Sequence, residues 1–190
     1  MLLTPLASWL VDMIVELIPK KSRVLEIGCG PGELACRLGM KCSKVTAIDI
    51  SERMIEYANR KKAKAKVYNV DVVCLPAAQV MQKLQGRFDY AISCFCLHEM
   101  DSRQRYEAVQ NCLTISDKMI ISDYRSPFPR SATAFGNITM EVLAGKRHFG
   151  NFRNWQASGG IDGLVESLKV RRIHEIEWKD GCGKTVVVSG

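Results

Sequence analysis

The segment RVLEIGCGPGELA, residues 23–35, constrains the fold more strongly than any other part of the chain. A short apolar run carries one acidic residue, Glu26, and is followed by Gly28, Gly30 and Gly32 at alternate positions. Glycines let a turn adopt unusual dihedral angles and let a ligand touch the backbone, and the proline between them suits the first turn of a helix. The segment predicts a buried strand, a tight turn and a helix N-terminus that hold a nucleoside-bearing ligand.

The remaining sequence alternates short apolar runs with amphipathic stretches, which predicts parallel βαβ units. Five strands are expected at 23–28, 44–49, 66–70, 87–94 and 118–123. Helices are expected at 4–18, 31–39, 51–62, 77–84, 102–114, 131–145 and 161–168, with an irregular connection over 145–160. Two strands, 170–179 and 184–189, flank a hairpin signal. We therefore expect one α/β domain over residues 1–190, with a Rossmann-like, seven-stranded, mostly parallel sheet, a C-terminal antiparallel strand pair and helices on both faces.

The eight cysteines are scattered and none of them forms a C-x-x-C pair, which predicts buried, reduced thiols in a cytoplasmic protein. No metal site is expected, because a site at Cys94 and Cys96 would need more nearby ligands than His98 alone. No apolar run reaches the roughly 20 residues that a membrane helix needs. The N-terminal residues do not have the pattern of a signal peptide.

The net charge of the chain is +7, and its densest basic run spans residues 60–66. Such a run suits an anionic partner such as RNA. It equally suits a solvated helix end, where cations are favoured, and we prefer this interpretation because no nucleic-acid-binding motif accompanies the charge.

Ligands of open α/β sheets bind beyond the carboxyl ends of the strands, so the residues that follow each expected strand are candidates for the site. Glu33 stands where a nicotinamide-binding motif would have its third glycine, which disfavours a diphosphate at the helix start. Asp49, after the second strand, can accept hydrogen bonds from ribose hydroxyls or can cap a helix. Asp71, after the third strand, can accept a bond from an adenine amino group or can serve a turn. His98, after the fourth strand, is a candidate base or a packed histidine.

Four segments in order resemble the motifs of class I S-adenosylmethionine-dependent methyltransferases, in particular the small-molecule and quinone-biosynthesis enzymes. These segments are 24–32, 47–51 with Met54 and Ala58, 71–76, and 88–98. The resemblance implies S-adenosylmethionine as cofactor. It implies that Glu26 and the glycine turn hold the methionine portion, that Asp49 binds the ribose and that Asp71 binds the adenine amino group. It further places Ile50, Met54 and Val72 beside the nucleoside, and Cys94 and Phe95 beside the sulfonium.

The acceptor is expected to be a small molecule, bound between the N-terminal helix (residues 1–22) and a lid-like segment (residues 125–158). The latter segment is rich in aromatic and cationic side chains, which can bind an anionic or planar acceptor or can simply pack. His98 and His148 are candidate bases, and the Tyr124 hydroxyl is a candidate acceptor contact. RNA or protein methylation and non-catalytic cofactor binding remain alternatives, and the sequence leaves the oligomeric state open.

Two features depart from the pattern of the family. Residues 114–118 replace the Pro-Gly-Gly turn that often precedes the fifth strand, which loosens the assignment to a subfamily. The fourth strand lacks an Asn-Pro-Pro-Tyr motif, which argues against base or glutamine nitrogens as acceptors.

Overall fold

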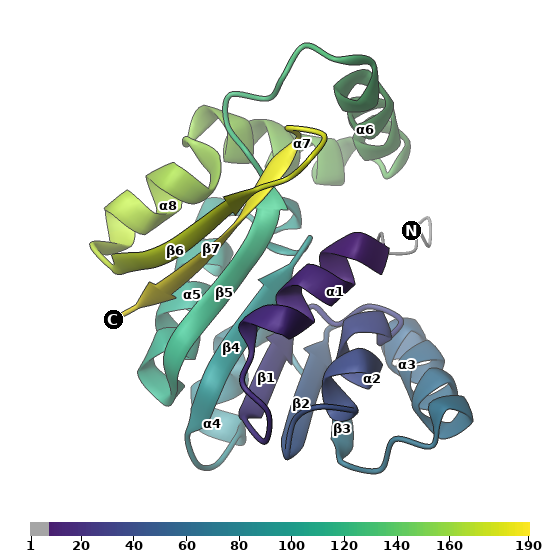
Figure 1. Cartoon of the computed structure of the whole chain (residues 1–190). Coiled ribbons are helices and arrows are strands. Elements are labelled where there is room, and N and C mark those ends of the chain that lie inside the picture. The colour runs from purple at the N-terminus through teal and green to yellow at the C-terminus, as the bar shows by residue number, and fades with distance from the viewer. Residues whose placement is uncertain (1–7) are drawn as a thin grey trace.

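The computed structural model describes residues 8–190, which form one seven-stranded sheet with helices on both of its faces (Figure 1). The strands are β1 (Arg23–Ile27), β2 (Lys44–Asp49), β3 (Val70–Cys74), β4 (Phe88–Cys94), β5 (Ser116–Tyr124), β6 (Arg171–Glu177) and β7 (Gly183–Ser189). The helices are α1 (Ser8–Leu17), α2 (Glu33–Gly39), α3 (Glu52–Ala65), α4 (Val80–Lys83), α5 (Ser102–Ile115), α6 (Ala132–Leu143), α7 (Lys146–Ala157) and α8 (Gly160–Leu168). Two short 3₁₀ helices are η1 (Ala77–Gln79) and η2 (Leu97–Glu99).

The strand order is β3-β2-β1-β4-β5-β7-β6, and this confirms the predicted fold class. The first five strands are parallel, whereas β7 runs antiparallel to both β5 and β6. The strand order reverses between β1 and β4, and ligands of such sheets bind at the carboxyl ends on either side of the reversal.

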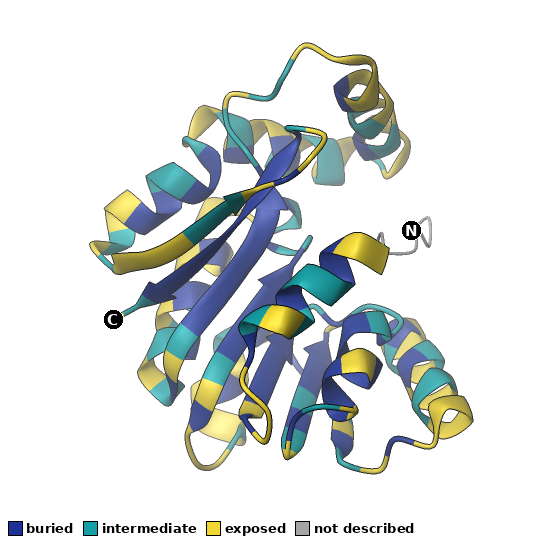
Figure 2. Cartoon of the chain, in the orientation of Figure 1, coloured by how far each residue is buried: buried dark blue, intermediate teal, exposed yellow. Residues whose placement is uncertain are grey.

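The central strands are buried because helices cover both faces of the sheet (Figure 2). Helix α2 packs against α1 and α3, and α5 packs against α4 and α8. Every residue of β1 after Arg23 is buried, so the glycine turn leaves from the middle of the core. No helix among residues 8–190 is long and apolar enough to cross a membrane.

The third strand lies four residues later than expected, over Val70–Cys74 rather than 66–70. Helix α3 continues to Ala65 and ends at Lys66 in a left-handed conformation. Asn69 then donates hydrogen bonds to the carbonyl oxygens of Gly39 (2.9 Å) and Cys42 (2.8 Å), which fixes the connection before the strand begins. Sequence periodicity missed the shift because residues 66–74 alternate well enough to be a strand in either place.

The expected irregular connection over 145–160 is instead helix α7, Lys146–Ala157. Three aromatic residues, Phe149, Phe152 and Trp155, recur at a spacing that places them on one side of this helix. Gly150 and the flanking glycines concealed the pattern. The expected helix over 4–18 is present from Ser8, and its proposed cap, Thr4–Pro5, lies outside the described residues.

The basic run occupies the C-terminal half of α3, where it forms ion pairs with acidic residues of its own surroundings. Arg60 pairs with Glu56, and Lys61 pairs with Glu33 at the start of α2. These contacts suit the interpretation as a solvated helix end. All eight cysteines are free thiols. Cys74 is exposed and Cys96 is half-buried, however, so the prediction of buried thiols is wrong at Cys74 and only partly met at Cys96.

Candidate functional site

The glycine turn after β1 has a backbone that only glycine adopts easily. The φ angles of Gly28, Gly30 and Gly32 are +68°, +51° and +78°. A β-carbon on Gly28 would lie 2.1 Å from Sγ of Cys96, and one on Gly32 would lie 2.8 Å from Cβ of Ala58 in α3. By contrast, a β-carbon on Gly30 would meet no described atom within 4 Å. The turn is therefore tightly packed at both ends and open above Gly30.

Asp49, at the end of β2, fixes this turn to the neighbouring strand. Its Oδ2 accepts a hydrogen bond from the Gly30 N–H at 2.9 Å, and its Oδ1 accepts one from the Ser51 N–H at 2.9 Å. The Ser51 side chain caps α3, so the helix-capping role considered for Asp49 belongs to its neighbour. A carboxylate offers about four acceptor positions, which leaves Asp49 with capacity for a pair of ribose hydroxyls.

The Glu26 side chain is buried in the sheet. Its Oε2 has no hydrogen-bond partner among the described residues. Burial, together with the nearby Asp49 carboxylate, raises the pKa of Glu26 to about 8. An orphaned acid beside an open glycine turn suits a ligand that brings its own cation, such as the ammonium of an amino acid.

The raised pKa of Glu26 predicts a pH-dependent stability that Glu26→Gln removes. The folded state holds a proton that the unfolded chain releases near pH 4.5. Wild-type stability should therefore fall as pH rises from about 5 to about 8, by roughly 1.4 kcal/mol per pH unit from this group. In urea unfolding at three pH values in that window, the free energy of unfolding of Glu26→Gln should rise relative to that of wild type as pH rises.

The control is Glu166→Gln, which alters an exposed glutamate of α8. Parallel pH profiles for wild type and Glu26→Gln would contradict the prediction.

The third strand does not present the side chains that the sequence predicted. Asp71 is the second residue of β3, opposite Thr46, and pairs with Lys44 at 2.6 Å. Val72 lies opposite Ala47 in the middle of the strand. The prediction that Asp71 follows the third strand is therefore wrong, because the strand begins at Val70. Both residues lie short of the carboxyl edge, away from the glycine turn.

Cys74 occupies the position beside Asp49 that was expected for Asp71. Its Sγ lies 3.7 Å from the carbonyl oxygen of Ile50, and the next residue, Leu75, donates its N–H to the Asp49 carbonyl at 2.9 Å. Ile50 itself is 74% exposed and is open to a ligand, whereas Met54 is only 2% exposed.

Cys94 and Phe95 lie at the carboxyl end of β4, as expected. Phe95 has a φ of +50°, an unfavourable angle for a bulky residue that persists where the surroundings hold it. Its ring packs against Tyr124 and Trp178, with centroid distances of 5.1 Å and 4.9 Å. This turn also places the Cys96 side chain against Gly28, so the loop after β4 covers the start of the glycine turn.

His98 is buried in η2 and is fixed by Asp123, near the end of β5. The His98 Nδ1 lies 2.6 Å from Oδ1 of Asp123, whose Oδ2 accepts the N–H groups of Leu97 and His98 at 3.0 Å and 3.3 Å. Burial alone would lower the pKa of His98, but the carboxylates of Asp123, Glu141 and Glu99 outweigh it and raise the pKa to about 9. Because Asp123 holds Nδ1, Nε2 is the ring nitrogen left to act as a base or a ligand, and the role of His98 as a base stays a prediction.

His148, from α7, meets the same cluster, because α7 packs against both η2 and α6. Its Nε2 lies 2.6 Å from Glu141 and 3.9 Å from Glu99. The contact with Glu141 raises the pKa of His148. Tyr124 is also buried here, and burial and the Glu141 carboxylate raise the pKa of its hydroxyl. The three residues predicted to be catalytic are thus brought together in space.

Sequence reasoning missed Asp123 and Glu141. Asp123 was visible as an acidic residue in an otherwise apolar strand, which is a signal for a buried, partnered carboxylate. Glu141 lies in α6 with no local pattern that distinguishes it from a solvent-facing glutamate. Its burial depends on α7, the helix that the sequence did not reveal.

The lid-like segment contains an apolar hollow of about 570 Å³. Its walls include Phe128, Phe149 and Phe152, and the exposed Arg153 lies among its lining residues. Phe128 and Phe152 pack against Tyr124, with centroids 5.3 Å and 5.5 Å away, and Tyr124 in turn contacts Phe95. Trp155 is not part of this hollow, because it is fully buried and donates a hydrogen bond to the Tyr124 carbonyl at 2.8 Å.

This strand order, with a glycine turn after β1 and an acidic residue at the end of β2, is that of the class I methyltransferase fold. Residues 24–117 match the family described as "Methyltransferase domain", and this part of the chain belongs to that family. The resemblance stated from the motifs is thereby confirmed.

Two curated relatives and one solved structure illustrate the similarity. The chain is 34% identical over 97 residues to 27-O-demethylrifamycin SV methyltransferase of Amycolatopsis mediterranei, covering 50% of this chain and 36% of that protein. It is 30% identical over 160 residues to ribosomal RNA small subunit methyltransferase C of Yersinia enterocolitica, covering 75% and 41%. The chain thus spans less than half the length of these curated relatives.

The solved structure shares the fold at low sequence identity. It is the N-methyltransferase NodS of Bradyrhizobium japonicum in complex with S-adenosyl-L-homocysteine. NodS superposes with a TM-score of 0.66 at 16% identity and covers 95% of this chain and 83% of its own.

Proposed function

We propose that this protein transfers the methyl group of S-adenosylmethionine to a small-molecule acceptor. The observation that carries the proposal is the open space above Gly30 beside the orphaned Oε2 of Glu26. Bound there, S-adenosylmethionine supplies a methyl carbon already activated by its sulfonium.

The residues around the glycine turn have the chemistry to hold such a cofactor. The unpaired Oε2 of Glu26 can accept a hydrogen bond from the cofactor's ammonium group. Asp49 offers unused acceptor positions for ribose hydroxyls, and Ile50 offers an exposed apolar surface. Glu33 pairs with Lys61 at the start of α2. The Glu33 carboxylate therefore already places a negative charge at this helix N-terminus, where a phosphate would otherwise bind.

The acceptor side is supplied by β4, β5 and the segment 125–158. The hollow lies within the roughly 300–1,000 Å³ range of small-molecule pockets. Its aromatic walls lead through Tyr124 to Phe95 at the end of β4. These side chains would orient a planar acceptor and exclude water, and positioning of this kind supplies much of the acceleration of a direct displacement. Arg153 offers a cation for an anionic substituent.

Methylation of RNA is the second candidate, favoured by the net charge of +7 and by the similarity to a ribosomal RNA methyltransferase. Two observations argue against RNA as the acceptor. Part of the densest basic run is paired with Glu56 and Glu33 in and beside its own helix. The hollow is also mainly apolar, with Arg153 as the one cation among its lining residues.

The test is incubation of the purified protein with methyl-labelled S-adenosylmethionine and a cell extract separated into metabolite, RNA and protein fractions. We expect label in the metabolite fraction with formation of S-adenosylhomocysteine, and no transfer by an Asp49→Ala variant. Label only in RNA or protein would replace the small-molecule acceptor with a macromolecule. If the protein binds the cofactor but no fraction contains labelled product, the result would favour a non-catalytic binding protein.

A further inference from the structure

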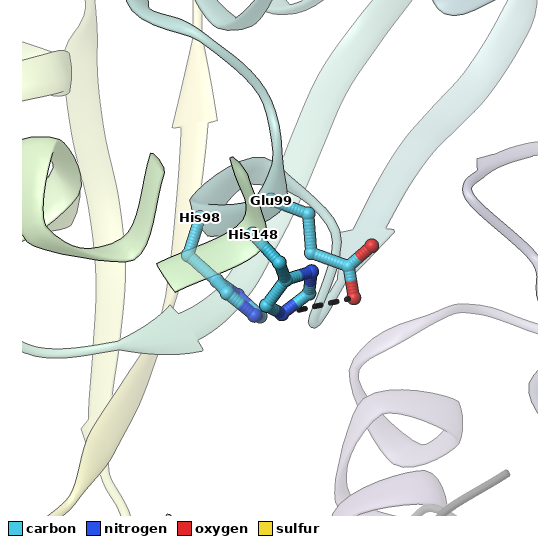
Figure 3. Close-up of side chains that lie close together, drawn as sticks. All are labelled: His98, Glu99 and His148. Atoms are coloured by element: carbon cyan, nitrogen blue, oxygen red, sulfur yellow. Dashed lines mark ion pairs between the residues drawn. The ribbon is translucent and has the colours of Figure 1, made fainter. Parts of the chain in front are cut away.

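Four side chains outside the cofactor site converge beyond the ends of β4 and β5. His98 and Glu99 come from η2, Glu141 comes from α6, and His148 comes from α7. Figure 3 shows His98, Glu99 and His148 pointing toward one another, and one ligand atom from each lies within 4.8 Å of the others. We propose that these residues bind a divalent transition-metal ion. This proposal replaces the expectation of no metal, which rested on His98 having no nearby companions in the sequence.

The orientation of His98 suits a metal ligand. Its Nδ1 is engaged by Asp123 at 2.6 Å, so its Nε2 faces the cluster, 3.6 Å from Oε1 of Glu141. Histidines that bind metals characteristically donate their other ring nitrogen to a carboxylate, which fixes the tautomer and the ring orientation. Asp123 would be the positioning residue of this site, because it holds both the ring and the backbone of η2.

Glu141 adds a buried carboxylate to the cluster. Its side chain is only 6% exposed. Its Oε2 lies 2.6 Å from Nε2 of His148, and its Oε1 lies 3.6 Å from Nε2 of His98. One buried carboxylate therefore faces both imidazoles, as it would if all three groups shared a cation.

The charges around the cluster also favour a cation. Three carboxylates, those of Asp123, Glu141 and Glu99, face two imidazoles. The nearest buried guanidinium, that of Arg105, donates to the carbonyl oxygens of Leu97 and Met100 at 2.9 Å instead. A divalent ion would take the place of the imidazole protons, because metal ligands must be deprotonated, and would supply the positive charge that the carboxylates face.

The ligand set indicates the kind of ion. Two imidazole nitrogens with carboxylate oxygens suit Zn²⁺, Fe²⁺ or Mn²⁺, whereas Mg²⁺ and Ca²⁺ prefer oxygen alone. Ligand atoms about 2.1 Å from one ion lie roughly 3–3.5 Å apart. The observed separations of 3.6 Å and 3.9 Å would shorten slightly on binding, and the 2.6 Å between Glu141 Oε2 and His148 Nε2 would lengthen.

The position of the cluster gives the ion a further use, which rests on the proposed function. His98 packs against Tyr124 and Phe152, with centroids 4.9 Å and 6.4 Å away, and Phe152 lines the hollow. An ion here could coordinate an acceptor hydroxyl and lower its pKa. The acceptor class is therefore a hydroxyl-bearing small molecule.

The test is calorimetric titration of Mn²⁺ and Zn²⁺ into the wild-type protein and three variants, with no methyl donor present. His148→Ala removes a ligand from the rim of the site, and Glu141→Gln removes a carboxylate at constant size. His174→Ala is the matched control, because the chain has three histidines and His174 is exposed on β6. Mn²⁺ is included because it discriminates against the free thiols.

We expect one ion per chain, with affinity lowered at least about 100-fold in His148→Ala and Glu141→Gln, since even loss of a supporting residue costs roughly 10–100-fold. His174→Ala should bind like wild type. Equal binding by wild type and the two folded cluster variants would overturn the site, as would the absence of wild-type binding to both ions. Metal binding without methyl transfer would sustain this site while contradicting the proposed function.

Discussion

Gly30→Ala is expected to lower the affinity for S-adenosylmethionine by about 100-fold while leaving the protein folded. The new β-carbon would point into open space, so it meets no described atom of the fold. It would instead occupy space proposed for the cofactor, and a misplaced methyl group in a packed contact costs up to about 3 kcal/mol. Because φ at Gly30 is +51°, alanine there also costs roughly 1–2 kcal/mol of stability.

The control for this substitution is Gly181→Ala. Gly181 has a φ of +68° in the turn between β6 and β7, and its added β-carbon also meets no described atom within 4 Å. The two variants should lose similar stability, measured by urea unfolding. Only Gly30→Ala should lose binding of S-adenosylhomocysteine in a calorimetric titration. Equal affinities in the two variants would contradict the placement of the cofactor.

Asp123→Ala is expected to destabilise the protein by about 3–5 kcal/mol, the range for breaking a buried pair. Asp123 is fully buried and accepts from His98 Nδ1 and from the N–H groups of Leu97, His98 and Tyr124. Removing its carboxylate leaves these donors without a partner, and Glu141, at 3.6 Å from His98 Nε2, is too distant to replace the lost hydrogen bonds.

Asp117→Ala is the control in the same strand. Asp117 is exposed at the other end of β5 and pairs with Arg87 at 2.8 Å. An exposed pair is worth about 1 kcal/mol or less. Urea unfolding of both variants should therefore separate them by at least about 2 kcal/mol. Comparable losses would mean that the Asp123 network does not hold the loop after β4.

The parts of the fold that the sequence predicted well are those where local pattern and tertiary structure agree. The expected second strand, 44–49, coincides with β2, and the glycine turn lies where the motif placed it. Asp49 and Phe95 lie at the carboxyl ends of strands as predicted, because Asp49 ends one clear apolar strand and Phe95 follows another. The mostly parallel sheet followed from the alternation of strands and helices, and its antiparallel end followed from the C-terminal hairpin signal.

The errors arise where tertiary contacts decide between equivalent local patterns. Residues 66–74 could form a strand in two places, and the Asn69 hydrogen bonds decide the outcome, which moves Asp71 from the edge of the sheet. Helix α7 forms despite Gly150 because it packs on η2 and α6. The His98–Glu141–His148 cluster depends on that packing, so spacing in the sequence could not reveal it.

The central claim is that the glycine turn binds S-adenosylmethionine. Its most direct test is calorimetric titration of the wild-type chain, in parallel, with S-adenosylmethionine, S-adenosylhomocysteine and NAD. The account predicts saturable binding of the first two ligands at one site per chain and no binding of NAD. Absence of binding by both adenosyl compounds, or tighter binding of NAD, would contradict it.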